Sequence, residues 1–147
     1  MRSLLIIATF FVCTGAHGQV GLAPVAADDA PKAIGPYSQA IKTGNLLYTS
    51  GQIGLVPATG TFAGNDIIAQ THQALKNLKA VVEKGGSDME HVVKVTIFLK
   101  DMDNYTTVND IYKDYFPGVK PARSAVQVAR LPKDALIEIE CVAELKK

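Results

Sequence analysis

The hydrophobic pattern of this chain changes its period near the middle, from the spacing of a helix to that of a strand. The helical part has apolar residues at Ile68, Leu75, Leu78 and Val82. Asn65-Asp66 offers an N-terminal cap and Gly85-Gly86 ends the run, as in an amphipathic helix. Segment 92–99 then alternates, with Val93, Val95, Ile97 and Leu99 on one face and Lys94 and Thr96 on the other. A helix followed by a half-buried strand is therefore predicted.

Other segments of the chain predict four further strands and a second helix. Segments 38–42 and 46–51, joined by Thr43-Gly44-Asn45, have the pattern of a β-hairpin. Asp103 is expected to cap a helix that ends at Phe116-Pro117-Gly118. This helix has Tyr105, Val108, Tyr112 and Tyr115 on one side. Two more strands, 124–128 and 136–145, are joined by turn residues at 131–134.

This order of elements predicts an α+β fold in which both helices cover one face of a mixed sheet. In the last strand, Ile137, Ile139, Cys141 and Ala143 are expected to face the helices, and Glu138, Glu140, Val142 and Glu144 to face away. The uncovered face of the strand at 92–99 carries Val92, Thr96 and Phe98, which is too apolar for water alone. A symmetric oligomer would bury that face.

Length and composition fit one ordinary globular domain. The chain has 147 residues, of which 48% are apolar and 20% charged, so its core needs neither disulfides nor metals. Lysines and arginines number 15 against 14 acidic residues, without a basic run. No nucleic-acid partner is expected, because backbone-driven binding needs a basic surface. The three histidines lack metal-ligand spacing, and no metal or cofactor is expected.

Residues 1–18 have the layout of a signal peptide. Arg2 precedes the apolar run 4–12, and Ala16 and Gly18 put small residues where a signal peptidase cleaves. A packed N-terminal strand is the alternative. We expect cleavage after Gly18, export to the periplasm or the exterior, and no stable membrane association afterwards.

The segment that follows, 19–32, is rich in Ala, Pro and Asp and has no hydrophobic period. We expect it to form a linker or a loosely ordered arm, with the folded domain spanning 33–147. After cleavage Cys141 is the single cysteine, so no internal disulfide is possible. Cys141 lies on the expected core face and is interpreted as an inert buried thiol.

Five short motifs and the sequence of the last strand resemble one known family over most of the chain, from about residue 30 to the C-terminus. They are Gly35-Pro36-Tyr37-Ser38-Gln39, Tyr48-Thr49-Ser50-Gly51-Gln52, Val108-Asn109, Pro121-Ala122-Arg123-Ser124, Ala129-Arg130-Leu131-Pro132 and Ile137-Glu138-Ile139-Glu140. Their order and spacing are similar to those of the reactive-intermediate (2-imino acid and enamine) deaminase family, also called the YjgF group. The resemblance implies a chorismate-mutase-like α+β fold, a homotrimer, and sites in the clefts between subunits.

Arg123 and Glu138 are the main candidate catalytic residues. Arg123 and Arg130 are the two arginines that follow the N-terminal segment, and a guanidinium binds a carboxylate through two parallel hydrogen bonds. The pattern alone favours a surface or interface ion pair for Arg123. The resemblance instead implies that Arg123 binds the substrate carboxylate and that Glu138 positions the attacking water. Arg130 precedes a turn and is interpreted as structural.

The remaining candidate residues would line the same site. Tyr37 is a packed aromatic residue or a catalytic one whose hydroxyl touches the ligand. The resemblance adds Ser50, Gly51, Asn109 and Ala125 as substrate-binding residues. Many relatives have a cysteine at the position of Ala125, so a thiol nucleophile there is excluded.

The resemblance implies a hydrolytic deaminase that converts small 2-imino acids, such as 2-iminopropanoate and 2-iminobutanoate, to 2-oxo acids and ammonia without a cofactor. Two other functions stay open: a non-catalytic carboxylate-binding or chaperone-like trimer, and an endoribonuclease or translation inhibitor. The resemblance also gives an alternative location, the cytoplasm or a mitochondrion.

Overall fold

The computed structural model describes residues 21–147, so the signal peptide expected at 1–18 lies outside the described residues. The strands are β1 (Ala23–Val25), β2 (Ala40–Thr43), β3 (Leu46–Thr49), β4 (Gln52–Ile53), β5 (Val92–Leu99), β6 (Ala122–Gln127) and β7 (Ile137–Glu144). The helices are α1 (Ile67–Lys84) and α2 (Tyr105–Tyr115), with single 3-10 turns η1 (Met89–His91), η2 (Met102–Asn104) and η3 (Pro132–Asp134).

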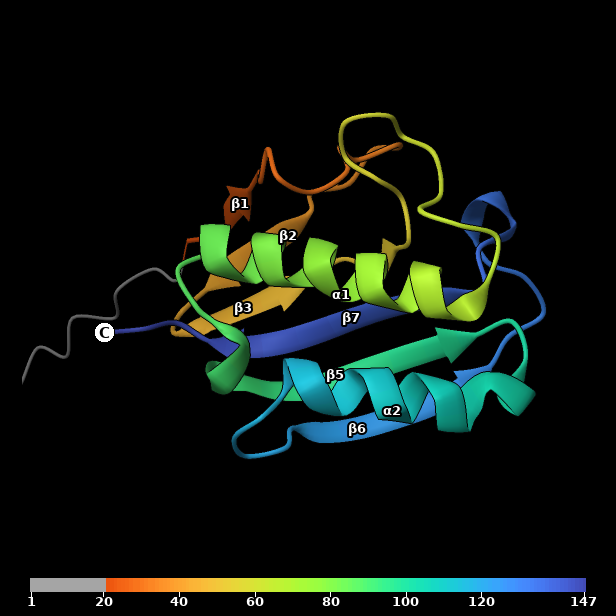
Figure 1. Cartoon of the computed structure of the whole chain (residues 1–147). Coiled ribbons are helices and arrows are strands. Elements are labelled where there is room, and N and C mark those ends of the chain that lie inside the picture. Colours follow the sequence, from red (N-terminus) through yellow and green to blue (C-terminus); the bar gives the residue numbers. More distant parts are fainter. Residues whose placement is uncertain (1–20) are drawn as a thin grey trace, which may run out of the picture.

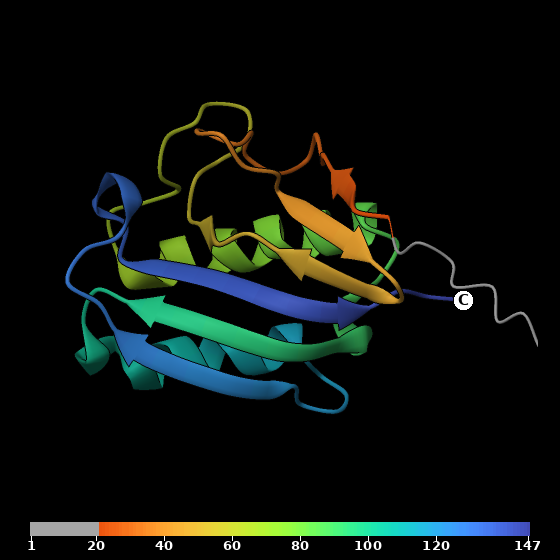
Figure 2. The same cartoon turned by 180° about the vertical axis from the view of Figure 1, so that it is seen from behind.

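The strands form one mixed sheet in the order β1-β2-β3-β7-β5-β6, and β4 pairs with β7 beside β3. Only β5 and β6 pair in parallel among these strands. Figure 1 shows both helices in front of the sheet, and Figure 2 shows the other face uncovered. The predicted α+β fold with two helices on one face is confirmed.

The core lies between this sheet and the two helices, as the hydrophobic pattern predicts. In α1, Leu75, Leu78 and Val82 of the predicted stripe are buried, whereas Ile68 in the first turn is 52% exposed. The Asp66 carboxylate caps the helix by accepting the Ala69 N–H at 2.9 Å. In β7 every second residue from Ile137 to Ala143 is buried, and the residues between them are half-buried. Within residues 21–147, no helix is long and apolar enough to cross a bilayer.

The start of β5 differs from the predicted alternation. Val93, expected on the core face, is 43% exposed, and Val92 is buried in its place at 5%. The pairing of β5 with β7 shifts between Val92 and Lys94, which is a β-bulge. The bulge reverses the facing of the first two residues, and the predicted alternation holds from Val95 onward.

The start of α2 also differs from the prediction that Asp103 caps it. Asp101 is the capping residue instead, and it caps the 3-10 turn η2 by accepting the Asp103 N–H at 2.9 Å. The α-helix begins after this turn, and Asn104 at its N-cap position makes no side-chain capping bond.

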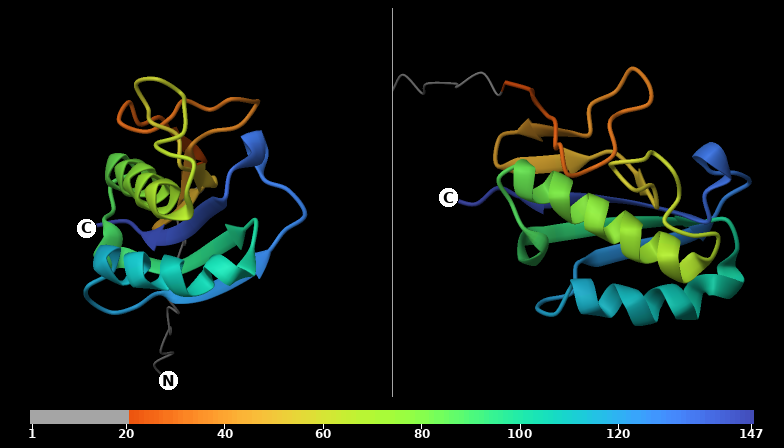
Figure 3. Two further views of the ribbon diagram at one scale, coloured as in Figure 1. Left: turned by 45° about the vertical axis from the view of Figure 1, so that its right-hand side comes forward. Right: turned by 45° about the horizontal axis from the view of Figure 1, so that its top comes forward.

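Residues 23–32 belong to the fold, which corrects the expectation of a linker or loosely ordered arm there. Strand β1 pairs with β2, and Ala27 and Ala30 are buried. The buried Gln39 amide accepts the Ala27 N–H at 2.5 Å and donates to the carbonyls of Ala27 and Pro31 at 3.1 and 2.8 Å. In Figure 3 this segment, in orange, lies at the same end of the molecule as the loop before α1.

Candidate functional site

A break between β3 and β4 places Gly51 against Glu138. Strand β3 pairs with the C-terminal part of β7 and β4 with its N-terminal part, so Ser50 and Gly51 interrupt what would be one strand. A Cβ atom on Gly51 would lie 1.8 Å from Oε1 of Glu138. Position 51 therefore admits no side chain while Glu138 keeps its conformation.

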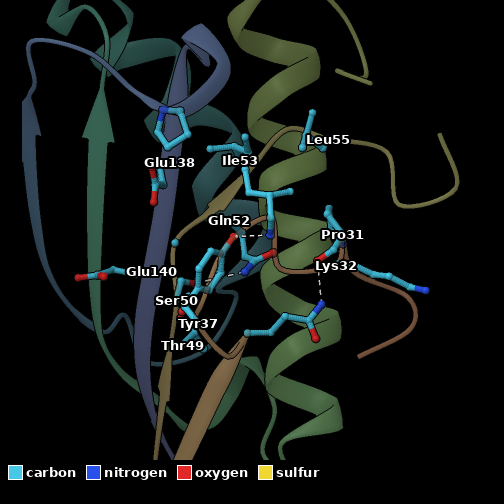
Figure 4. Close-up of a pocket in the computed structure, with 14 residues that line it drawn as sticks. Pro31, Lys32, Tyr37, Thr49, Ser50, Gln52, Ile53, Leu55, Glu138 and Glu140 are labelled. Carbon is cyan, nitrogen blue, oxygen red and sulfur yellow. Dashed lines mark hydrogen bonds between the residues drawn. The ribbon is translucent and has the colours of Figure 1, made fainter. Parts of the chain in front are cut away.

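A pocket of about 460 Å³ opens at this break. It is lined by Pro31, Lys32, Ile34, Tyr37, Gln39, Thr49, Ser50, Gly51, Gln52, Ile53, Leu55, Pro132, Glu138 and Glu140. In Figure 4 the side chain of Lys32 extends away from the two glutamates. We call this the Glu138 pocket.

Two predicted residues of the Glu138 pocket have hydroxyls that bond to the protein itself. Tyr37 is 47% exposed, and its hydroxyl accepts the Ile34 N–H at 3.3 Å. The Ser50 hydroxyl donates to the Ser38 carbonyl at 2.7 Å. The Ser50 N–H also donates to the Gln39 carbonyl at 2.9 Å, so Ser50 fixes the loop that carries Tyr37.

Glu138 is a half-buried carboxylate without a basic partner among residues 21–147. Burial raises its pKa above the ordinary value, and the neighbouring carboxylate of Glu140 raises the pKa further.

Cys141, the next residue of β7 after Glu140, is buried and was predicted to be an inert thiol. Burial raises the pKa of its thiol to about 12, so it stays protonated and unreactive near neutral pH.

Arg123 lies in a second pocket, of about 550 Å³, between β6 and α2. Its Nη2 donates to the Tyr105 hydroxyl at 3.1 Å. Its guanidinium carbon lies 4.6 Å from the centre of the Tyr112 ring and 5.6 Å from that of Tyr105. Within residues 21–147 no carboxylate pairs with Arg123, unlike Arg130, which binds both carboxylate oxygens of Asp134 at 2.7 and 3.0 Å.

The Arg123 pocket contains the other two predicted residues, Asn109 and Ala125. Tyr105 and Tyr112, the neighbours of the arginine, were not among the predicted site residues. Their shared helix side was the available signal, but the sequence does not state which strand that side packs against. Pro31 and Lys32 were also not predicted, because they fall in the segment that was expected to be a linker.

The two pockets lie on opposite faces of the sheet. Arg123 in β6 pairs with Val95, which is fully buried beneath the helices. Glu138 in β7 pairs with Phe98, and residues three apart in a strand point to opposite faces. A single chain therefore gathers Tyr37, Ser50, Gly51 and Glu138 in one pocket and Arg123, Asn109 and Ala125 in the other.

Both pockets, and every strand and helix except β1, lie within a region that matches a known family. The sequence model of the endoribonuclease L-PSP family matches residues 27–145. The chain belongs to this family. A RutC family protein of Pyrococcus horikoshii is 53% identical over 116 residues, which cover 79% of this chain and 92% of that protein.

Two relatives have names that state a deaminase activity. Reactive Intermediate Deaminase A, chloroplastic, of Arabidopsis thaliana is 51% identical over 121 residues, covering 82% of this chain and 65% of that protein. The 2-iminobutanoate/2-iminopropanoate deaminase of Mus musculus is 48% identical over 114 residues, covering 78% of this chain and 84% of that protein. These names bear out the family resemblance drawn from the motifs.

Solved structures of relatives share the fold. A putative endoribonuclease L-PSP from Entamoeba histolytica superposes with a TM-score of 0.83 at 48% identity, covering 85% of this chain and 100% of that one. The TdcF protein of E. coli, solved with bound serine, has a TM-score of 0.81 at 39% identity, covering 84% and 99%.

The relatives overturn the expectation of export. The compartment that one of these names gives is the chloroplast, which lies inside the cell. The family match begins at residue 27 and so does not include the apolar N-terminal segment. Secretion or a periplasmic location, inferred from 1–18, was wrong. The alternative of the cytoplasm or a mitochondrion is the one that these relatives allow.

Proposed function

We propose that this protein hydrolyses small reactive 2-imino acids and their enamine forms, such as 2-iminopropanoate and 2-iminobutanoate, to 2-oxo acids and ammonia. One observation carries the proposal: Arg123 has no carboxylate partner and Glu138 has no basic partner within residues 21–147, and each lines a pocket. A ligand with a carboxylate at one end and an electrophilic carbon at the other would use both residues. The names of the mouse and Arabidopsis relatives support this substrate class.

A homotrimer would bring the two pockets together. The uncovered sheet face exposes Tyr48 and Val126 and includes Phe98, which is only partly buried, so a second copy of the chain would bury apolar surface there. In the proposed assembly, the Arg123 pocket of one subunit lies against the Glu138 pocket of its neighbour. Each cleft between subunits then holds one complete site.

The proposed reaction needs positioning and charge, and no covalent intermediate with the protein. Arg123 binds the substrate carboxylate through two parallel hydrogen bonds. Glu138 takes one proton from a water molecule whose oxygen attacks C2 of the C=N bond, and the imine nitrogen gains that proton, which gives a carbinolamine. The carbinolamine then loses ammonia and leaves the 2-oxo acid. Tyr37 lines the same pocket as Glu138 and is proposed to contact the ligand through its hydroxyl.

The pocket around Arg123 suits a single carboxylate better than a polyanion. Lys113 at its margin pairs with Asp110 at 3.1 Å, and Lys120 donates to the Phe116 carbonyl. Arg123 is thus the cation of this pocket without an anionic or carbonyl partner in the part of the chain that the structure describes. This argues against RNA as the substrate, although the family name contains the word endoribonuclease.

A coupled assay tests the proposed function. An L-amino-acid oxidase acting on L-alanine or L-2-aminobutanoate generates the imine in place, and ammonia release is followed with and without the protein. The protein should accelerate ammonia release above the rate in buffer, and Arg123→Ala should not. A protein that binds 2-oxobutanoate but gives no acceleration would be a carboxylate-binding protein instead. Cleavage of a single-stranded RNA by the same preparation, without imine hydrolysis, would favour the endoribonuclease.

A further inference from the structure

The Arg123 guanidinium is held by two tyrosines of α2 that act in different directions. The Tyr112 ring lies under its face, with 4.6 Å between the guanidinium carbon and the ring centre. The Tyr105 hydroxyl accepts a hydrogen bond from Nη2 at 3.1 Å. We propose that Tyr105 is a positioning residue, whose hydroxyl fixes the orientation in which Arg123 receives the substrate carboxylate. This inference rests on the proposed function of Arg123.

The two contacts constrain different motions of the guanidinium. An aromatic face attracts a cation placed over it but does not define how a planar guanidinium is rotated within its own plane. A hydrogen bond to one terminal nitrogen defines that rotation. The guanidinium has five N–H donors, so the bond to Tyr105 leaves a pair of donors for a carboxylate. Tyr105 therefore orients the arginine without occupying its binding edge.

Tyr105 itself is attached to the strand that carries Arg123. It is the first residue of α2, directly after the turn η2. In that turn the Met102 N–H donates to Oε1 of Gln127, in β6, at 3.0 Å. The start of the helix and the strand of the arginine are thus joined, which keeps the hydroxyl at a fixed distance from Arg123.

The electrostatics of the tyrosine agree with this role. The Asn109 amide and then the Arg123 guanidinium lower the pKa of Tyr105 below the ordinary value. Both groups thus stabilise negative charge on the phenol oxygen, as is expected when hydrogen-bond donors point toward that oxygen. The lysines at the pocket margin, Lys113 and Lys120, are the other titratable groups that line it besides Tyr112.

The test is the variant Tyr105→Phe, which removes the hydroxyl and keeps the ring. The expected result is a KM for the imine about three- to tenfold higher, with a kcat within about twofold of wild type. Without the hydroxyl, the Arg123 guanidinium is no longer held in the orientation that binds the substrate carboxylate. Tyr115→Phe is the matched control on the same helix. It removes a hydroxyl that donates to the His72 carbonyl at 3.2 Å, away from the Arg123 pocket, and its KM should match wild type.

Calorimetric binding of 2-oxobutanoate separates this inference from the proposed function. Affinity should fall about three- to tenfold in Tyr105→Phe and stay unchanged in Tyr115→Phe, whatever the rate of imine hydrolysis. Wild-type affinity and KM in Tyr105→Phe would overturn the positioning role, as would an equal loss in both variants. Normal binding by the wild-type protein without imine hydrolysis would overturn the proposed function and leave the role of Tyr105 to be judged by affinity alone.

Discussion

Arg123 and Glu138 lie on opposite faces of the same sheet. The arginine pairs in register with Val95 on the helix-covered face, and the glutamate pairs with Phe98 on the uncovered face. The sheet separates the two side chains, so one chain cannot offer both to one small ligand. This relationship is the reason why the proposed catalytic site requires contact between subunits.

Replacing Arg123 by lysine should be nearly as damaging as replacing it by alanine. An ammonium keeps the positive charge but cannot form the two parallel hydrogen bonds, each of which contributes about 1.5–3 kcal/mol when the acceptor is charged. We expect kcat/KM for imine hydrolysis to fall by roughly 100-fold or more in Arg123→Ala and by nearly as much in Arg123→Lys. Arg130→Lys is the matched control, because Arg130 is exposed and pairs with Asp134. Wild-type rates in Arg123→Lys would exclude binding of the substrate carboxylate through two parallel hydrogen bonds from Arg123.

Glu138→Gln should lower turnover more than it weakens ligand binding. The amide has nearly the same shape, and its oxygen still accepts a hydrogen bond from water, but it cannot take a proton from that water. We therefore expect kcat to fall roughly tenfold or more. The affinity for 2-oxobutanoate, measured by calorimetry, should change far less. Equal losses of turnover and affinity would assign Glu138 to binding.

The pH dependence of kcat should have an acidic limb above the pH at which an ordinary glutamate titrates. Burial and the charge of Glu140 both raise the pKa of Glu138, so its active ionised form is lost at a higher pH as the solution is acidified. Glu140→Gln removes the second cause and should move the limb toward lower pH. A limb that stays in place in this variant would show that another group controls the acidic loss of activity.

Gly51→Ala should disable the site while leaving the fold intact. The new Cβ would lie 1.8 Å from Oε1 of Glu138, so the carboxylate must rotate away. We expect kcat to fall at least about tenfold, and the free energy of unfolding by about 1–3 kcal/mol from overpacking. Gly118→Ala is the control, because no atom lies within 4 Å of its added Cβ. Full activity of Gly51→Ala would contradict the described position of Glu138.

The sequence predicted those parts of the fold that depend on local pattern. The alternation of β7 and the α1 stripe from Leu75 to Val82 follow directly from residue spacing, and both are present. The facing of Val93 could not be predicted, because a bulge depends on the register with a partner strand. The ordered segment 23–32 depends on Gln39, whose amide bonds a backbone twelve residues earlier.

The motifs predicted residues that line the two pockets, but not how these residues are divided between the pockets. The family motifs identified Arg123, Glu138 and their neighbours as candidates, and each of these residues lines a pocket in the structure. Which residues share a pocket depends on strand order and pairing, which no motif states. The role of Tyr105 likewise required the position of α2 against β6.

The most direct test of the account mixes two impaired variants, each with a different pocket damaged. Arg123→Ala subunits supply only an intact Glu138 pocket, and Glu138→Gln subunits only an intact Arg123 pocket. Co-expressed in equal amounts as mixed trimers, with the trimer mass checked by light scattering, they should regain about a quarter of wild-type imine hydrolysis. That fraction of the clefts pairs the two intact pockets if assembly is random. A mixture no more active than its parents, despite confirmed mixed trimers, would contradict a site shared between subunits.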